Sequence, residues 1–309
     1  MSASDDGHVT VWELGAIEHR WRTCHEGVAT VAVSPDGIVV SGGRNGDLQL
    51  WDANSGAHRA GPWRQHNDRI WSVCLSPDGE CIASCSADGT FIIWDAHSLP
   101  AGRVIRGPIQ TGLGAVRAIA YCPLGRRLAT SGHDSTIKIW VWDDDTGDLQ
   151  ATLLRQTDTT PSSEYETVPS VSWTKDGNNV ISGSADGTVR MWDVSKREMM
   201  WEISAHADAI HCIAVSQHVF ATAAADHTIS VWNLQTRDLV DPFPINLASS
   251  TGRHDEAHCV VLTADENALI ASTKNGEIFT IDIGDIIPDM KVVSPSPSIL
   301  MGLTHSRSL

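Results

Sequence analysis

The sequence predicts an all-β protein built as an array of similar four-stranded blades, and two observations lead to this fold class. Short β-like runs end in the same kind of residue at intervals of roughly 40–50 residues, which indicates one supersecondary unit copied and stacked. Turn residues separate the apolar runs in between, and no segment has helical periodicity. The repeated runs end at Trp12, Trp51, Trp94, Trp140, Trp192 and Trp232, and a seventh has Ile281 in the same place.

Residues 65–96 show how the elements of one repeat are predicted. The apolar residues of 70–75 form a first strand, which stops at the turn Ser-Pro-Asp-Gly of residues 76–79. A second strand follows and ends at residues 87–89, where Asp-Gly is typical of a tight hairpin. Residues 91–94 form the third strand, and a more polar fourth strand leads into the next repeat. Each repeat therefore predicts four short antiparallel strands.

The hairpin turn recurs in every repeat with an Asp or an Asn at the same position. Both residue types hydrogen-bond their own backbone in tight turns, so exchanging one for the other is chemically mild. The turn residues are Asp6, Asn45, Asp88, Asp134, Asp186, Asp226 and Asn275.

These repeats resemble the WD-repeat β-propeller family, because a Ser or Thr, an Asp and a Trp-Asp pair lie at fixed offsets with a His upstream. The resemblance covers essentially the whole chain and implies a propeller with a seven-blade register. It also implies a hydrogen-bonded tetrad of His, Ser or Thr, Asp and Trp within a repeat. A catalytic His–Ser–Asp interpretation is less favoured, because the same trio recurs from blade to blade. Two repeats carry all four residues, namely His66, Ser84, Asp88 and Trp94, and His206, Thr222, Asp226 and Trp232.

The first repeat is incomplete, because Ser2 aligns with the Ser or Thr of the tetrad. We expect a single propeller domain over residues 1–293, in which a partial blade at 1–24 lacks its innermost strand and most of its second strand. Residues 286–293 are expected to form the outer strand of the last blade, and 294–309 a disordered tail. Propellers protect their sheet edges by closing radially, so an open first blade predicts lower stability or self-association. A truncated gene product is an alternative explanation.

Composition argues against several classes of function. Asp and Glu (38) outnumber Lys and Arg (22), and the resulting charge of −16 disfavours sequence-independent nucleic-acid binding. No apolar run approaches the roughly 18 residues of a membrane helix, and the N-terminus has no signal-peptide pattern. The seven cysteines, an odd number, favour a reducing cytosol or nucleus. Cys81 and Cys85 fall in one predicted strand, too far apart to share a metal.

The resemblance also implies which residues surround the central channel on one rim. In the family this rim is formed by the loops before the innermost strands and by the hairpins after the second strands. One set of rim residues follows the first apolar position of each innermost strand: Ala29, Trp71, Arg117, Pro169, His211 and His258. A second set precedes each turn Asp or Asn: Asp5, Arg44, Ala87, His133, Ala185, Ala225 and Lys274.

This rim is rich in basic and aromatic residues for a chain of charge −16. Arg and Trp are common interface anchors, and Trp71 beside Arg69 and Arg117 indicates a site for an acidic or phosphorylated peptide. Chance placement among 22 basic residues is a competing interpretation. A metal site formed by His211 and His258 is a second competing interpretation. Two histidines without a carboxylate are weak evidence for it. The residues predicted to bind a partner are Trp71, Arg69, Arg117, His211, His258, Arg44, His133 and Lys274.

The leading functional hypothesis is a non-catalytic scaffold, without a cofactor, that docks peptides or proteins on this rim. An enzyme or small-ligand binder at the channel mouth is an alternative, although no recognisable catalytic motif occurs. The titratable rim residues available to it are Asp5, His133, His211 and His258.

A ubiquitin-ligase substrate receptor is a second alternative. Family members in that role often carry Arg two positions after Trp-Asp, where the second repeat of this chain has Asn54. Two long rim loops, residues 155–167 and 241–256, are expected to be either functional or disordered because of their length.

Overall fold

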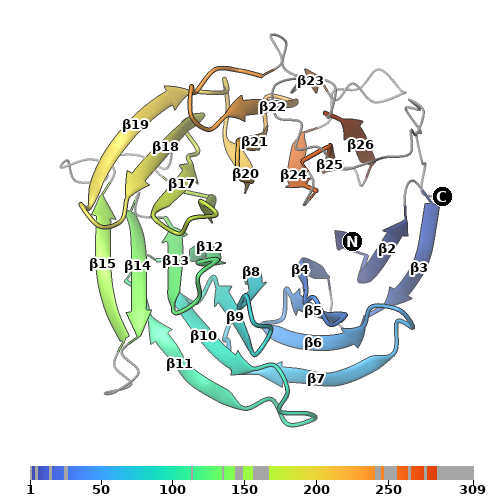
Figure 1. The fold of residues 1–309 in the computed structure, drawn as a ribbon. Helices are drawn as coiled ribbons and strands as arrows, with labels where there is room; N and C mark the ends of the chain where they lie inside the picture. The colour runs from blue at the N-terminus through green and yellow to red at the C-terminus, as the bar shows by residue number, and fades with distance from the viewer. Residues whose placement is uncertain are drawn as a thin grey trace.

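The computed structural model is a ring of seven antiparallel sheets (Figure 1). It describes residues 2–3, 6–13, 16–23, 27–112, 114–133, 136–142, 149–155, 167–240, 245–246, 256–263, 266–274 and 277–283. The only regular elements in these segments are β-strands, and none of the segments contains a helix. The predicted all-β propeller is therefore confirmed. We number the sheets as blades 1 to 7 in chain order.

Five blades have four strands and two have three. Blade 1 contains β1 (Ser2–Ala3), β2 (His8–Glu13) and β3 (Ala16–Arg22). Blade 2 contains β4 (Val28–Val33), β5 (Ile38–Gly43), β6 (Asp47–Asp52) and β7 (His58–Arg64). Blade 3 contains β8 (Ile70–Leu75), β9 (Cys81–Ser86), β10 (Thr90–Asp95) and β11 (Val104–Gln110).

The remaining blades continue the pattern. Blade 4 contains β12 (Val116–Tyr121), β13 (Arg127–Gly132), β14 (Thr136–Trp142) and β15 (Leu149–Arg155). Blade 5 contains β16 (Ser170–Trp173), β17 (Asn179–Gly183), β18 (Thr188–Asp193) and β19 (Glu198–Ser204). Blade 6 contains β20 (Ile210–Val215), β21 (Val219–Ala224), β22 (Thr228–Asn233) and β23 (Ile245–Asn246). Blade 7 contains β24 (Ala257–Leu262), β25 (Ala268–Thr273) and β26 (Ile278–Asp282).

The turns of blade 3 explain why its strands begin and end where they do. Gly79 closes the Ser-Pro-Asp-Gly turn with a φ of 79°, a left-handed conformation that glycine adopts without steric cost. The hydroxyl of Ser76 accepts a hydrogen bond from the backbone N–H of Cys81 (2.9 Å) at the start of β9. At the second hairpin, the carboxylate of Asp88 accepts from the backbone N–H of Thr90 (2.9 Å). Local turn chemistry therefore sets the strand register in this blade.

The hydrophobic core consists of six clusters, each between two neighbouring blades. Between blades 2 and 3, for example, Leu48 and Leu50 pack with Ile70 and Ile82, all of them fully buried. Strand β1 of blade 1 lies beside β4, and the innermost strands β4, β8, β12, β16, β20 and β24 lie side by side in turn around the ring. The fold therefore holds the starts of these strands on one rim.

Within the described residues, blade 1 has three strands. Its innermost described strand, β1, pairs only Ser2 and Ala3 with β2. None of the six clusters of the described residues joins blade 7 to blade 1, and Val261 and Ile270 of blade 7 are 53% and 40% exposed. The expected outer strand 286–293 and the tail 294–309 lie outside the described residues.

Most of the two long loops also lies outside the described residues. None of the described segments forms a helix that is long and apolar enough to cross a membrane.

Candidate functional site

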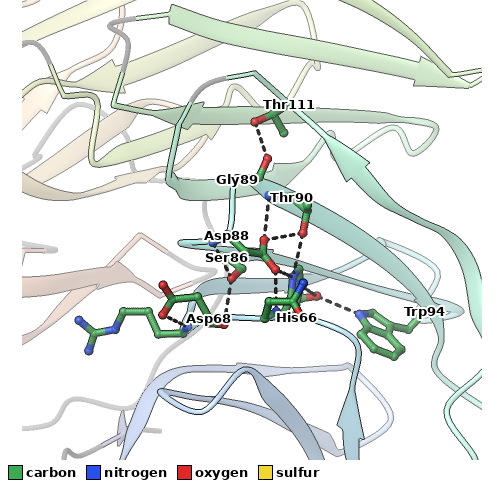
Figure 2. A network of polar contacts seen from close by, with 11 residues as sticks. His66, Asp68, Ser86, Asp88, Gly89, Thr90, Trp94 and Thr111 are labelled. Carbon is green, nitrogen blue, oxygen red and sulfur yellow. Dashed lines mark hydrogen bonds and ion pairs between the residues drawn. The ribbon is translucent and has the colours of Figure 1, made fainter.

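The four predicted tetrad residues of blade 3 form one hydrogen-bonded network (Figure 2). His66 Nε2 lies 2.8 Å from Ser84 Oγ, which also accepts a hydrogen bond from Trp94 Nε1 (2.9 Å). His66 Nδ1 lies 3.3 Å from Asp88 Oδ2 and 3.0 Å from the hydroxyl of Thr90. The network ties the segment before β8 to β9 and β10, so it fixes the geometry of one blade. Thr90 is a member that the sequence reasoning missed.

Blade 6 repeats this arrangement with Thr in place of Ser. His206 Nε2 lies 2.7 Å from the hydroxyl of Thr222, which accepts from Trp232 Nε1 (3.1 Å). His206 Nδ1 lies 3.1 Å from Asp226 Oδ2 and 3.0 Å from Thr228 Oγ1. Two distant repeats thus converge on the same contacts.

Blades 4 and 5 lack the tetrad His but keep the bond between Trp and the hydroxyl. Trp140 Nε1 donates to Thr130 Oγ1 (2.8 Å), and Trp192 Nε1 donates to Ser182 Oγ (3.0 Å). In blade 5 the guanidinium of Arg190 contacts the turn carboxylate of Asp186 (3.1 Å). A different cation therefore holds the turn Asp in this blade.

Burial and hydrogen bonds together set the direction of the pKa shifts in the tetrad of blade 3. It lowers the pKa of His66, and the nearby carboxylate of Asp88 opposes this effect only in part. Burial by itself would raise the pKa of Asp88, but hydrogen bonds from Thr90 and from the backbone of Asn67 outweigh it and lower that pKa. The side chain of His66 and the whole of Ser84 have no exposed surface. A solute therefore does not contact these groups in this structure, which is the environment that the predicted structural role requires.

The predicted rim residues lie at β-bulges in five blades. In each of these blades, one residue of the inner strand has no paired residue on the second strand. Bulges redirect side chains and are frequent next to functional sites. The skipped residues are Ala29, Trp71, Arg117, His211 and His258. Pro169 precedes β16, whose pairing has no such shift.

The residues before the turn Asp or Asn lie next to these bulges. In blade 3 the backbone N–H of Ala87 donates to the carbonyl of Arg69 (3.0 Å), and in blade 7 that of Lys274 donates to the carbonyl of Glu256 (3.0 Å). Arg69 and Glu256 each come directly before an inner strand, and we call such a residue the pre-strand residue. Blades 2, 3, 6 and 7 therefore each present a pre-strand residue, a bulge residue and a hairpin residue at one place on the rim.

Blades 3 and 4 bring four of the predicted residues together. The guanidinium carbons of Arg69 and Arg117 lie 4.1 and 3.9 Å from the ring centroid of Trp71. Arg117 Nε also donates a hydrogen bond to Nε2 of His133 (3.0 Å). We call Arg69, Trp71, Arg117 and His133 the cationic cluster.

Within the described segments, no carboxylate pairs with the arginines of the cationic cluster. Burial and the charge of Arg69 lower the pKa of Arg117, and burial and the charge of Arg117 lower the pKa of His133. Arg69 Nε and Trp71 Nε1 are buried and have no hydrogen-bond partner among the described residues. A buried donor without an acceptor lowers stability by about 1–3 kcal/mol, and a bound ligand that supplies the acceptor would remove this penalty.

Blades 6 and 7 form a second cluster of rim residues with a different charge balance. The rings of His211 and His258 have their centroids 5.7 Å apart. The carboxylate of Glu256 accepts from Lys274 Nζ at 3.0 Å and lies 3.8 Å from His211 Nε2. Burial and His258 lower the pKa of His211, while Glu256 opposes them. We call His211, Glu256, His258 and Lys274 the neutralised cluster, because Glu256 balances the charge of Lys274.

Other predicted rim residues stand apart from these two clusters. Arg44 is exposed at the hairpin position of blade 2, and its backbone N–H donates to the carbonyl of Gly27 (3.0 Å). Asp5 lies outside the described residues. In the described segments no three His, Cys, Asp or Glu residues are arranged to hold a metal. Glu256, which the sequence reasoning did not include, follows the long loop before blade 7 and has no place in the repeat motif.

Comparison with known proteins agrees with the repeat pattern. The model of the family described as "WD domain, G-beta repeat" matches residues 18–52, 60–95, 105–141, 156–193 and 197–233. Four of these five segments begin in, or immediately before, the outer strand of one blade and end in the third strand of the next. Each of these four segments is therefore shared between two blades.

Three relatives illustrate how widely the repeat occurs. The chain is 30% identical to Telomerase protein component 1 of Rattus norvegicus over 229 residues, 68% of this chain and 8% of that protein. It is 26% identical to Apoptotic protease-activating factor 1 of Rattus norvegicus over 92% of this chain and 21% of that protein. It is 30% identical to Small ribosomal subunit protein RACK1y of Oryza sativa subsp. japonica over 54% of this chain and 48% of that protein. The chain thus spans less than half the length of each of these relatives, and it belongs to the WD-repeat family.

Proposed function

We propose that this chain is a non-catalytic interaction scaffold that docks an acidic peptide segment of a partner protein on the cationic cluster. WD-repeat relatives support a protein-interaction role in general. The observation that carries the finer proposal is the stacking of Arg69 and Arg117 on Trp71 without a carboxylate partner in the described segments.

The stacking prepares the cluster for an anionic ligand. A guanidinium held over an indole keeps its N–H edges free, and these edges match the geometry of a carboxylate or a phosphate. Arg and Trp together are also typical of the few residues that carry most of the energy of an interface. The cluster thus combines two fixed cations with an aromatic surface.

The negative charge of the whole chain should direct an acidic peptide to the cationic cluster. A formal charge of −16 repels an acidic peptide from most of the surface, so the cationic cluster is a local attraction in a repulsive field. Surface electrostatics are screened by salt, and the affinity should therefore fall as ionic strength rises. A phosphorylated residue carries about −1.5 to −2 charges and three acceptor oxygens, so it should strengthen binding.

The test measures fluorescence anisotropy of labelled peptides that share one sequence and differ only in charge: phosphorylated, acidic, neutral and basic. The proposal predicts that the phosphorylated peptide binds best and the basic peptide does not bind. In Arg117→Glu the phosphorylated peptide should lose about 100-fold in affinity, as expected for reversing a charged hydrogen-bond partner.

Arg106→Glu is the matched control, because Arg106 is exposed on the outer strand β11 of blade 3, and the charge change is the same. This variant should retain the affinity within about twofold, since isolated surface charges contribute little. Equal losses in the two variants, or equal binding of all four peptides, would show that the cationic cluster is not the docking site.

A further inference from the structure

Two cysteines on neighbouring blades bring their sulfur atoms together. Cys212 of β20 and Cys259 of β24 are 47 residues apart in the sequence, and their Sγ atoms lie 3.6 Å apart. Both thiols are free. Among the six described cysteines, no other two sulfur atoms are hydrogen-bonded to each other. This juxtaposition is independent of the cationic cluster.

The rim bulges explain how the two sulfurs meet. Cys212 and Cys259 each directly follow the skipped bulge residue of their strand. At the same position in blade 2, the hydroxyl of Thr30 accepts a hydrogen bond from the backbone N–H of Val73 in blade 3 (3.3 Å). The position therefore bridges adjacent inner strands, and in blades 6 and 7 it is occupied by two thiols in succession.

The two thiols differ in accessibility and in acidity. Cys259 is exposed and Cys212 is half-buried. The neighbouring Val261 is 53% exposed. The hydrogen bond between the sulfurs lowers the pKa of Cys259 and, together with burial, raises that of Cys212. Since the thiolate is the reactive form, Cys259 is the better nucleophile of the two.

We propose that Cys212 and Cys259 form an oxidisable dithiol, at which a peroxide converts the two free thiols into a disulfide between blades 6 and 7. The Cys259 thiolate attacks one peroxide oxygen, which forms a sulfenic acid on Cys259 and releases the other oxygen as water after protonation. The sulfur of Cys212 then attacks Cys259 Sγ and displaces hydroxide, which leaves as a second water with the proton from Cys212. Two electrons and two protons pass from the thiols to hydrogen peroxide, and two waters result.

The geometry requires only a short approach. A disulfide bond is about 2.05 Å long, so the sulfurs must close by about 1.5 Å through side-chain rotation and a small shift of β24. The bond would tie His211 to His258, whose positions immediately precede the two cysteines in the chain. Oxidation should therefore stiffen the neutralised cluster and leave the cationic cluster unchanged.

The test treats the full chain with a slight molar excess of hydrogen peroxide, blocks the remaining thiols with iodoacetamide, and maps the unreduced digest by mass spectrometry. We expect a peptide that joins Cys212 to Cys259 within one molecule, lighter by two hydrogens and separated by dithiothreitol. It should form at least about tenfold faster than oxidation products of Cys74 or Cys122. This measurement uses the wild-type chain and does not depend on a variant that folds.

Two variants locate the steps. In Cys212→Ser, dimedone should trap a sulfenic acid on Cys259, whereas Cys122→Ser should form the disulfide at the wild-type rate. The proposal is overturned if the peroxide-treated wild type contains no Cys212–Cys259 peptide, or if Cys259 oxidises no faster than Cys74. It is also overturned if Cys259 is found joined to a second molecule instead of to Cys212.

Discussion

Two surfaces of the same rim place side chains at equivalent positions and differ in charge. On blades 3 and 4 the cationic cluster has Arg69 as a pre-strand residue, and no carboxylate of the described segments pairs with it. On blades 6 and 7 the neutralised cluster has Glu256 as a pre-strand residue, and it pairs with Lys274 at 3.0 Å. The pre-strand position thus carries a cation in one region and an acid in the other.

The comparison separates the role of the scaffold from that of the site. In both regions a bulge directs a side chain onto the rim, and the hairpin residue lies beside it. These features come from the repeat and are shared by blades with unrelated side chains, such as Ala29 in blade 2. Binding chemistry is then set by the few residues that the repeat leaves free to vary.

The largest effect is expected on stability, when the scaffold is broken beneath an intact rim. His66→Ala leaves Asp88 and Ser84 without their buried partner, which should lower the free energy of unfolding by about 2–4 kcal/mol. Chemical denaturation monitored by circular dichroism measures this loss. His97→Ala, an exposed residue of the same blade, should change it by less than about 0.5 kcal/mol. Equal values for the two variants would mean that the tetrad contributes little to the fold.

The next largest effect is expected when the cationic cluster receives the acidic pre-strand residue of the neutralised cluster. Arg69→Glu places the pre-strand acid of blade 7 in blade 3, where it can pair with Arg117, and should weaken phosphopeptide binding about 100-fold. The free energy of unfolding should stay within about 1 kcal/mol of wild type, because Arg69 is only half-buried and the new carboxylate can pair with Arg117. Calorimetric titration gives the affinity. If the variant keeps its affinity and its stability, the pre-strand residue does not determine phosphopeptide binding.

A smaller effect is expected from the opposite change. Glu256→Gln frees Lys274 and should raise the affinity of blades 6 and 7 for an acidic peptide by about two- to fivefold, as for a single exposed charge. The measurement is made in the Arg117→Glu background, so that the cationic cluster does not contribute. Glu198→Gln on the outer strand β19 changes the net charge equally. If both variants raise affinity alike, the gain reflects net charge and not the rim.

The smallest effect concerns the protonation of His133. Burial, and secondarily the charge of Arg117, hold the pKa of His133 below its ordinary value of 6.5. The imidazole therefore stays neutral down to a lower pH than a free histidine, and protonation removes the acceptor for Arg117 Nε. In Arg117→Gln, NMR titration should show the midpoint of His133 rising while it remains below 6.5. A midpoint that is unchanged or falls would contradict the contact.

Much of the fold follows from local chemistry that the sequence displays. The period of the Trp-ending runs predicts the blades, and the Asp-Gly turns predict the hairpins, because each signal acts within a few residues. The bulges do not follow in this way, since strand register depends on the pairing of two whole strands.

The sites depend on contacts between blades, which a single repeat does not encode. The sequence indicates that Trp71 and Arg117 lie on the rim, but their stacking requires the distance between β8 and β12. Glu256 has no repeat position that marks it, and Cys212 meets Cys259 only because two bulges align across neighbouring blades. The residues of the rim are therefore predictable, whereas their partners are not.

The most direct test of the account locates a bound peptide on the wild-type rim. A phosphorylated acidic peptide with a photoreactive group next to the phosphate is crosslinked to the full chain, and the products are mapped by mass spectrometry. The account predicts crosslinks at residues 69–71, 117 and 133, which high salt suppresses. Crosslinks at His211, His258 or Lys274 in place of these residues would contradict the claim that the unpaired guanidinium groups of blades 3 and 4 select the ligand.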